Sequence, residues 1–169
     1  MKIKVIKRPF IEPIDTQSAL DFLRVDDPYE TGLVSSLITV AREWAEEYTG
    51  RKFINTKVRL SLGYVSDKVT LPYGDFYVDS IKSNGKDISP NDYEIDDDEI
   101  IFNKLFNKVV IEYTVGYGET ITDVPESVKQ AILMLVGALY EQRSDLTFNL
   151  NVKTSPLTSR YLLDQLRLY

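Results

Sequence analysis

The chain has 169 residues, with 20 basic and 26 acidic side chains, a net charge of −6, and neither histidine nor cysteine. These absences exclude Ser-His-Asp and Cys-His nucleophile systems, zinc sites built on histidine or cysteine, disulfides and iron–sulfur clusters. The composition, 43% hydrophobic and 27% charged, is that of a globular protein, and its acidity disfavours a broad surface that binds nucleic-acid phosphates.

The first part of the chain, to about residue 50, is predicted to be helical. Asp15 or Thr16 can cap a short helix that ends near Leu23, and Gly50 can end a longer helix that begins near Thr31. In the longer helix, apolar residues recur at spacings of three and four, which predicts a buried stripe. This stripe comprises Leu33, Leu37, Val40, Ala41, Trp44, Ala45 and Tyr48.

Trp44 lies on this predicted stripe, and we expect it to be buried where the long helix meets a later one. The alternative is that Trp44 is an exposed anchor for a partner. The acidic residues Glu43, Glu46 and Glu47 are predicted to form the solvated face of the same helix.

Between about residues 57 and 117 the hydrophobic period changes to two, which predicts strands. Asn84-Gly85 favours a two-residue type I′ turn, and the acidic run at 96–99 is expected at the tip of another hairpin. We expect an antiparallel meander of about six strands. In its last strand, one face is predicted to comprise Val109, Ile111, Tyr113 and Val115.

The basic segment Lys2 to Arg8 alternates with Ile3, Val5 and Ile6. It fits two descriptions equally well. One is an edge strand with a charged outer face, and the other is a segment that contacts phosphate or an acidic partner.

The last part of the chain is again predicted to be helical, with a helix over about residues 124–143. Its second apolar stripe is a candidate subunit interface, with packing beneath the strands of the same chain as the alternative. This candidate interface comprises Leu133, Val136, Gly137 and Tyr140.

A polar segment from residue 144 is expected to be mobile, and a terminal helix is expected from about Ser159. So short a helix must dock to persist, either on its own subunit or on a partner. The candidate docking residues are Arg160, Tyr161, Leu162, Leu166, Arg167 and Tyr169. The fold class predicted overall is α+β: one domain with helices at 15–50 and 124–143, a β insertion at 57–117 and a C-terminal arm at 144–169.

Several patterns that could carry chemistry have simpler interpretations. Six carboxylates lie between Asp92 and Glu99 and could suggest a Ca²⁺ or Mg²⁺ site, but three of the aspartates are contiguous and no glycine is present, unlike the alternating ligands of a calcium loop. We expect a solvated hairpin tip instead. The segment Gly116-Tyr117-Gly118 lacks the third glycine of a dinucleotide fingerprint and the Gly-Lys of a P-loop. The longest apolar run, 131–140, is too short to span a bilayer, and no signal peptide is apparent, so we expect a cytoplasmic chain. No catalytic residue, metal or cofactor is predicted.

Five segments together resemble the head–tail connector family of tailed bacteriophages, the head-completion adaptors. They occur in the same order as in that family, between residues 19 and 143. The segments are ALDFLRVD (19–26), AREWAEEYTGRKFI (41–54), VIEYTVGYG (110–118), VPESVKQAIL (124–133) and YEQR (140–143).

This resemblance implies a non-enzymatic structural protein of the virion, assembled in the host cytoplasm. It would form a ring of about a dozen copies between the portal protein and a tail or stopper protein, and DNA would pass through the ring without specific binding. The acidity of the chain is compatible with such a channel. The C-terminal arm would bind the portal or a neighbouring subunit. The rival functions are a carboxylate-dependent, metal-assisted hydrolase and a monomeric module that binds ligands on its β meander.

Overall fold

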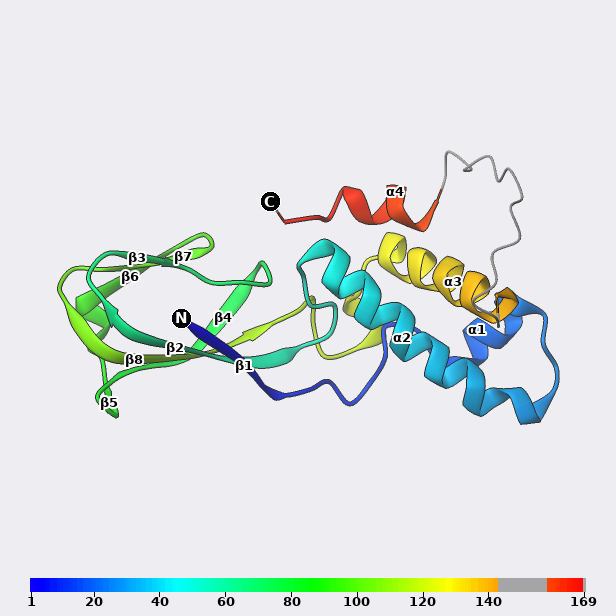
Figure 1. Cartoon of the computed structure of the whole chain (residues 1–169), viewed down its shortest axis with the longest axis horizontal. Coiled ribbons are helices and arrows are strands. Elements are labelled where there is room, and N and C mark those ends of the chain that lie inside the picture. Colours follow the sequence, from blue (N-terminus) through cyan, green and yellow to red (C-terminus); the bar gives the residue numbers. More distant parts are fainter. Residues whose placement is uncertain (143–157, 169) are drawn as a thin grey trace. The chain divides into compact units, whose positions relative to one another are not determined.

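The computed structural model describes residues 1–142 and 158–168 (Figure 1). The chain forms two compact units: Met1–Phe10 with Gly50–Glu119, and Ile11–Thr49 with Thr120–Tyr169. Antiparallel strands build the first unit, the β unit, and helices build the second, the helical unit. The predicted α+β class is therefore confirmed. The segment expected to be mobile falls largely on residues 143–157, outside the described residues.

The β unit contains two antiparallel sheets (Figure 1). The larger has the order β1 (Lys2–Lys7), β2 (Thr56–Val65), β8 (Phe106–Val115), β4 (Phe76–Ser83), β5 (Lys86–Asp87). The smaller has the order β3 (Lys68–Thr70), β7 (Glu99–Phe102), β6 (Tyr93–Asp96), and a short 3₁₀ turn, η2 (Pro90–Asp92), precedes β6. The strand positions agree with the hydrophobic period, but the strands do not pair in chain order as a meander requires. Period-two alternation identifies a strand without identifying its neighbour.

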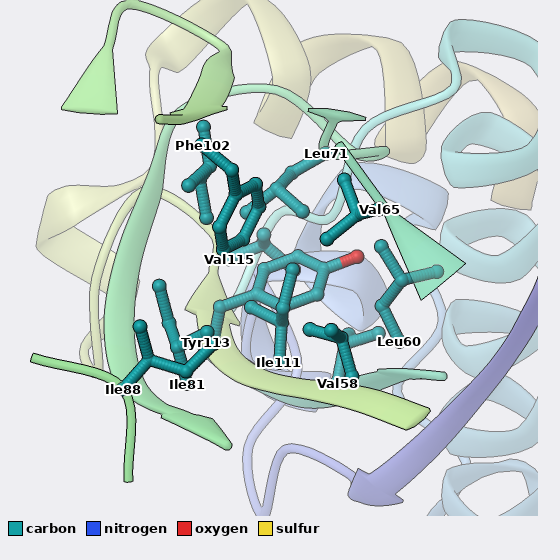
Figure 2. Packing of buried hydrophobic residues seen from close by; sticks show 12 residues of the cluster. Val58, Leu60, Val65, Leu71, Ile81, Ile88, Phe102, Ile111, Tyr113 and Val115 are labelled. Atoms are coloured by element: carbon teal, nitrogen blue, oxygen red, sulfur yellow. The ribbon is translucent and has the colours of Figure 1, made fainter. Parts of the chain in front are cut away.

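The two sheets share one hydrophobic core (Figure 2). The predicted inward face of β8 is confirmed, because all four of its residues are buried. They pack with Val58 and Leu60 of β2, Ile81 of β4, and Ile100 and Phe102 of β7.

The predicted type I′ turn is also confirmed: Asn84 and Gly85 have φ angles of 50° and 80° between β4 and β5. At the tip of the β6–β7 hairpin, within the acidic run, Asp97 has a φ of 45°.

The basic N-terminal segment is an edge strand, so the first of its two interpretations is confirmed. In the antiparallel pair with β2, Ile3 lies opposite Leu60 and Val5 opposite Val58. Because both partners point into the core, Ile3 and Val5 face inward, and the alternating lysines face outward.

The helical unit consists of four α-helices and two 3₁₀ turns within the described residues. α2 packs against α3 and α1, and α4 packs against α3 and α2 (Figure 1). No helix in residues 1–142 and 158–168 combines the length and apolarity that a membrane span requires. In chain order, the elements are α1 (Thr16–Leu23), η1 (Pro28–Glu30), α2 (Thr31–Thr49), η3 (Ile121–Asp123), α3 (Glu126–Glu141) and α4 (Ser159–Asp164).

The helix boundaries agree well with the sequence. Asp15 caps α1, because its carboxylate accepts the backbone N–H of Ser18 at 2.7 Å. Gly50, with a φ of 71°, follows the last residue of α2.

The predicted inward face of α2 was wrong in part. Trp44 is 39% exposed, and Leu33 and Val40 of the same helix are exposed too. The buried residues of α2 are Val34, Ile38, Ala41, Arg42, Ala45, Glu46 and Thr49. The helix is rotated relative to the prediction, so that the paired side chains of Arg42 and Glu46 enter the interior.

Candidate assembly surfaces

The acidic run at 96–99 forms the tip of the β6–β7 hairpin. Glu99 accepts hydrogen bonds from Lys68 at 3.1 Å and Thr70 at 3.2 Å, and the hydrogen bond to Lys68 lowers the pKa of the Glu99 carboxyl. The carbonyl of Asp98 accepts the N–H of Leu71 at 2.9 Å. Among the described residues, no three histidine, cysteine, aspartate or glutamate side chains are grouped closely enough to hold a metal ion.

Two residues of the connector-like segment 41–54 belong to a buried ion cluster. The Arg42 guanidinium donates to Glu12 Oε2 at 2.6 Å and to Glu46 Oε2 at 3.2 Å. Thr39 Oγ1 also donates to Glu12 at 2.9 Å. Burial acts to lower the pKa of Arg42, but the hydrogen bond to Glu12 and the charges of Glu46 and Glu12 outweigh it and raise that pKa.

This cluster corrects the prediction that Glu46 lies on a solvated face. Glu46 is buried because Arg42, one turn earlier, neutralises it. Sequence reasoning missed the role of Glu12, which lies 30 residues before Arg42 in the chain. The only available signal was the i, i+4 spacing of opposite charges in α2.

The next part of segment 41–54 meets segment 110–118 inside the β unit. The carbonyl of Phe53 accepts the N–H of Tyr117 at 3.3 Å, and their rings stack with centroids 6.4 Å apart. Asn55 donates its N–H to the carbonyl of Gly118 at 2.9 Å. At Gly116, a Cβ would lie 2.6 Å from the carbonyl carbon of Ile54. Two of the sequence segments that carry the family resemblance therefore form one structural corner.

An apolar strip runs along the exposed side of α2. We call Leu33, Leu37, Val40 and Trp44 the α2 stripe, because they recur at spacings of three and four on one face. Leu33, Val40 and Trp44 are exposed and Leu37 is half-buried. The Trp44 ring stacks on Tyr48, with centroids 5.1 Å apart and planes at 9°. The sequence pattern had identified these residues as apolar and helical but had placed them in the core.

The short helix α4 docks on the helical unit of its own chain. Leu163 is fully buried there, and Leu168 donates its backbone N–H to the carbonyl of Thr49 at 2.9 Å. Tyr48 donates its hydroxyl to Asp164 at 2.5 Å, and this hydrogen bond raises the pKa of Tyr48. Sequence reasoning missed Leu163, because the adjacent leucine 162 fitted the predicted stripe equally well.

The two arginines of the predicted arm lie over aromatic rings of α2. The guanidinium of Arg160 is 5.9 Å from the centre of the Trp44 ring, and that of Arg167 is 5.5 Å from the Tyr48 ring. Of the other predicted arm residues, Tyr161 is exposed, Leu162 and Leu166 are half-buried, and Tyr169 lies outside the described residues.

The predicted interface residues of α3 differ in their surroundings. Val136 is fully buried within its own chain, and a Cβ on Gly137 would lie 3.4 Å from the ring of Phe22 in α1. Leu133 and Tyr140 are half-buried. Val136 and Gly137 therefore serve packing inside the subunit, while Leu133 and Tyr140 keep part of their surface accessible.

No protein-family model matches the sequence, and no curated protein sequence matches it. Solved structures do match, each over 100% of this chain and 96% of the other. One is from the neck of an empty gene transfer agent particle computed with C6 symmetry (19% identity, TM-score 0.84). Others are from the virion of a native particle (18%, 0.80) and from the neck of a native particle computed with C12 symmetry (17%, 0.72). The chain thus shares the whole fold of these virion and neck chains.

Proposed function

We propose that this chain is a structural protein of a phage-like virion, a head–tail connector that forms a ring between the portal and a tail or stopper protein. The observation that carries this proposal is the full-length fold match to chains from particle necks, at a TM-score of 0.84. The connector-like segments of the sequence support it independently. The ring would contain about a dozen copies, and DNA would pass through it.

The α2 stripe supports the assembly part of the proposal. Leu33, Val40 and Trp44 expose apolar surface along one face of one helix, with the half-buried Leu37 between them, and exposed apolar surface of this kind is typical of interaction sites. Large aromatic side chains such as Trp44 are common anchors of protein interfaces. We place the α2 stripe, with the accessible parts of Leu133 and Tyr140, at the contact between neighbouring subunits.

Two other functions compete with a connector. A metal-assisted hydrolase would bind divalent metal stoichiometrically and turn over a substrate, and a β-unit binding module would act as a monomer. Calorimetry with Ca²⁺ and Mg²⁺ tests the first, and the mass of the protein in the presence of portal tests the second. A connector is expected to bind neither ion tighter than about 10 μM, the range of sensor sites.

The decisive experiment is co-expression with the portal, followed by sedimentation and electron microscopy. A ring bound coaxially to the portal is expected. Val40→Ser with Trp44→Ser should leave the subunit folded and abolish the ring, because polar side chains remove the apolar contact. The matched control is Tyr64→Ser with Tyr77→Ser, two exposed aromatic side chains of the β unit. A wild-type chain that stays monomeric with portal present would overturn the proposal.

A further inference from the structure

Four strands of the β unit each leave one backbone edge unpaired within the described residues: β1 and β5 in the larger sheet, and β3 and β6 in the smaller. Because β5 has only two residues and β3 only three, β1 and β6 present the longest open edges. β1 pairs only with β2 at one edge of the larger sheet, and β6 pairs only with β7 at one edge of the smaller sheet. An open edge presents a row of N–H and C=O groups that can accept another strand.

The two edges carry opposite charges. The outward side chains of β1 include Lys2 and Lys4, and those of β6 are Glu94 and Asp96. All four are exposed, and none of them forms an ion pair within residues 1–142 and 158–168. Asp96 also lies directly opposite Glu99 in the β6–β7 pair, but Lys68 forms its ion pair with Glu99 and not with Asp96.

The core-facing side chains of the two edge strands are also alike, because each strand has a partly exposed isoleucine. Ile3 of β1 is 37% exposed and Ile95 of β6 is 49% exposed, although both point to the core side of their sheets. If the two strands paired, the alternation would set isoleucine beside isoleucine on one face and lysine beside carboxylate on the other.

The two edges belong to different sheets, and β6 follows the far edge of the larger sheet in the chain. β1 is one edge of the larger sheet and β5 is the other, and only residues 88–92 separate β5 from β6. A contact that joins two different patches of a subunit is head-to-tail, and repeated head-to-tail contacts close into a ring when the rotation between neighbours divides a full turn, and otherwise form an open chain.

We propose that β1 of one copy pairs with β6 of the next copy, so that the sheets of neighbouring subunits join edge to edge. This inference rests on the proposed ring and deepens it, because it names a second subunit contact in the β unit. The charges also select the arrangement. Two β1 edges repel each other, as do two β6 edges, so a symmetric dimer through either edge is disfavoured.

Cysteine cross-linking tests the contact directly, because the chain has no cysteine of its own. One variant carries Lys2→Cys or Lys4→Cys, and a second carries Glu94→Cys or Asp96→Cys. Each β1 variant is mixed with each β6 variant, which gives four mixtures. Together they test parallel and antiparallel pairing at these outward-facing positions. A disulfide requires Cα atoms within about 7 Å, so at least one mixture should give mixed dimers about tenfold above the control. The control pairs Glu94→Cys with Tyr77→Cys, an exposed position on the inner strand β4.

Charge exchange gives an independent test without cysteine. Lys2→Glu with Lys4→Glu should weaken assembly, as should Glu94→Lys with Asp96→Lys. Mixing the two variants should restore it, because each mixed contact again joins opposite charges. Circular dichroism of each variant confirms that the subunit is folded.

The outcomes separate this inference from the proposed function. A wild-type ring without cross-linking in any of the four mixtures overturns the strand pairing and leaves the ring intact. Cross-linked open chains without rings support the pairing and overturn the ring. Neither cross-links nor rings would overturn both.

Discussion

Gly116 shows how one residue can be required by the close approach of two segments. Its φ is 132°, and a Cβ there would lie 2.6 to 2.8 Å from backbone atoms of Ile54 and Asn55. Asn55 donates its N–H to the carbonyl of Gly118, and Phe53, the residue before Ile54, accepts the N–H of Tyr117. The backbone of residues 53–55 therefore cannot move away from position 116 without straining these hydrogen bonds. A side chain at position 116 would therefore combine steric conflict with an unfavourable φ.

We predict that Gly116→Ala lowers the free energy of unfolding by about 3 kcal/mol or more. The matched control is Gly63→Ala in β2, where a Cβ would meet nothing within 4 Å. That change should be close to neutral. Urea denaturation of both variants measures the difference, and equal effects at the two glycines would contradict the prediction.

Arg42 stabilises the helical unit by compensating buried carboxylates. We predict that Arg42→Met costs about 3–5 kcal/mol of unfolding free energy, because it breaks the buried ion pair between Arg42 and Glu46 by removing one partner. Replacing both residues, Arg42→Met with Glu46→Leu, should recover much of the loss. The control is Arg59→Met, which removes a partly exposed ion pair to Glu112 and should cost less than about 1 kcal/mol.

The stability that Asp15 confers by capping the start of α1 depends on pH. The hydrogen bonds from the Ser18 backbone N–H and hydroxyl hold the pKa of Asp15 below its ordinary value of 3.8. Because the folded pKa is lower than the unfolded one, the stabilisation is complete above the unfolded pKa and is lost as pH falls through the folded pKa. Asp15→Ala should therefore cost about 1 kcal/mol at pH 7 and progressively less in strong acid. Thermal melts of the wild type and the variant from pH 2 to 7 measure this difference in stability. A difference that stays constant with pH would contradict the prediction.

At the scale of elements, α4 illustrates how a very short helix depends on docking. Six residues cannot form a stable isolated helix, so its contacts with α2 and α3 must hold it. We predict that Leu163→Ala lowers the unfolding free energy by about 2–5 kcal/mol, as other buried leucine truncations do. Tyr161→Ala, at an exposed position of the same helix, should have little effect.

Truncation after Arg143 extends this test to the whole arm. Docking on its own subunit predicts a lower melting temperature for the truncated chain. Unchanged melting together with lost portal binding would instead favour the role of a partner arm, and would contradict the effect expected at Leu163.

At the scale of the whole molecule, the exposure of Trp44 provides an optical signal for assembly. It is the only tryptophan in the chain, so all tryptophan emission reports on the α2 stripe. We predict that acrylamide quenches Trp44 in the isolated subunit and quenches it much less in the ring, because assembly covers the stripe. Protection of Trp44 in the monomer, or equal quenching in both states, would contradict this prediction.

Strand order and side-chain partners also belong to this scale. The period-two alternation of β8 predicted its buried face, yet it could not show that β2 and β4 would be its neighbours. The segments that resemble the connector family could be identified in the sequence, but the binding of Arg42 to Glu12 and the contact of Gly116 with Ile54 are long-range interactions that the sequence pattern does not show.

The type and approximate bounds of the helices and main strands, the turn at Asn84-Gly85, and the absence of histidine and cysteine chemistry all follow from the amino-acid sequence alone. These features depend on interactions between residues close in the chain, namely periodicity, capping and turn geometry. The buried side of α2, in contrast, depends on contacts with residues far away in the chain. The predicted stripe and the observed buried face of α2 both contain Ala41 and Ala45. The observed face also contains Arg42, whose charge is neutralised by Glu12, 30 residues earlier in the chain. Such long-range pairing leaves no periodic trace, so Trp44 was predicted inside and is found at the surface.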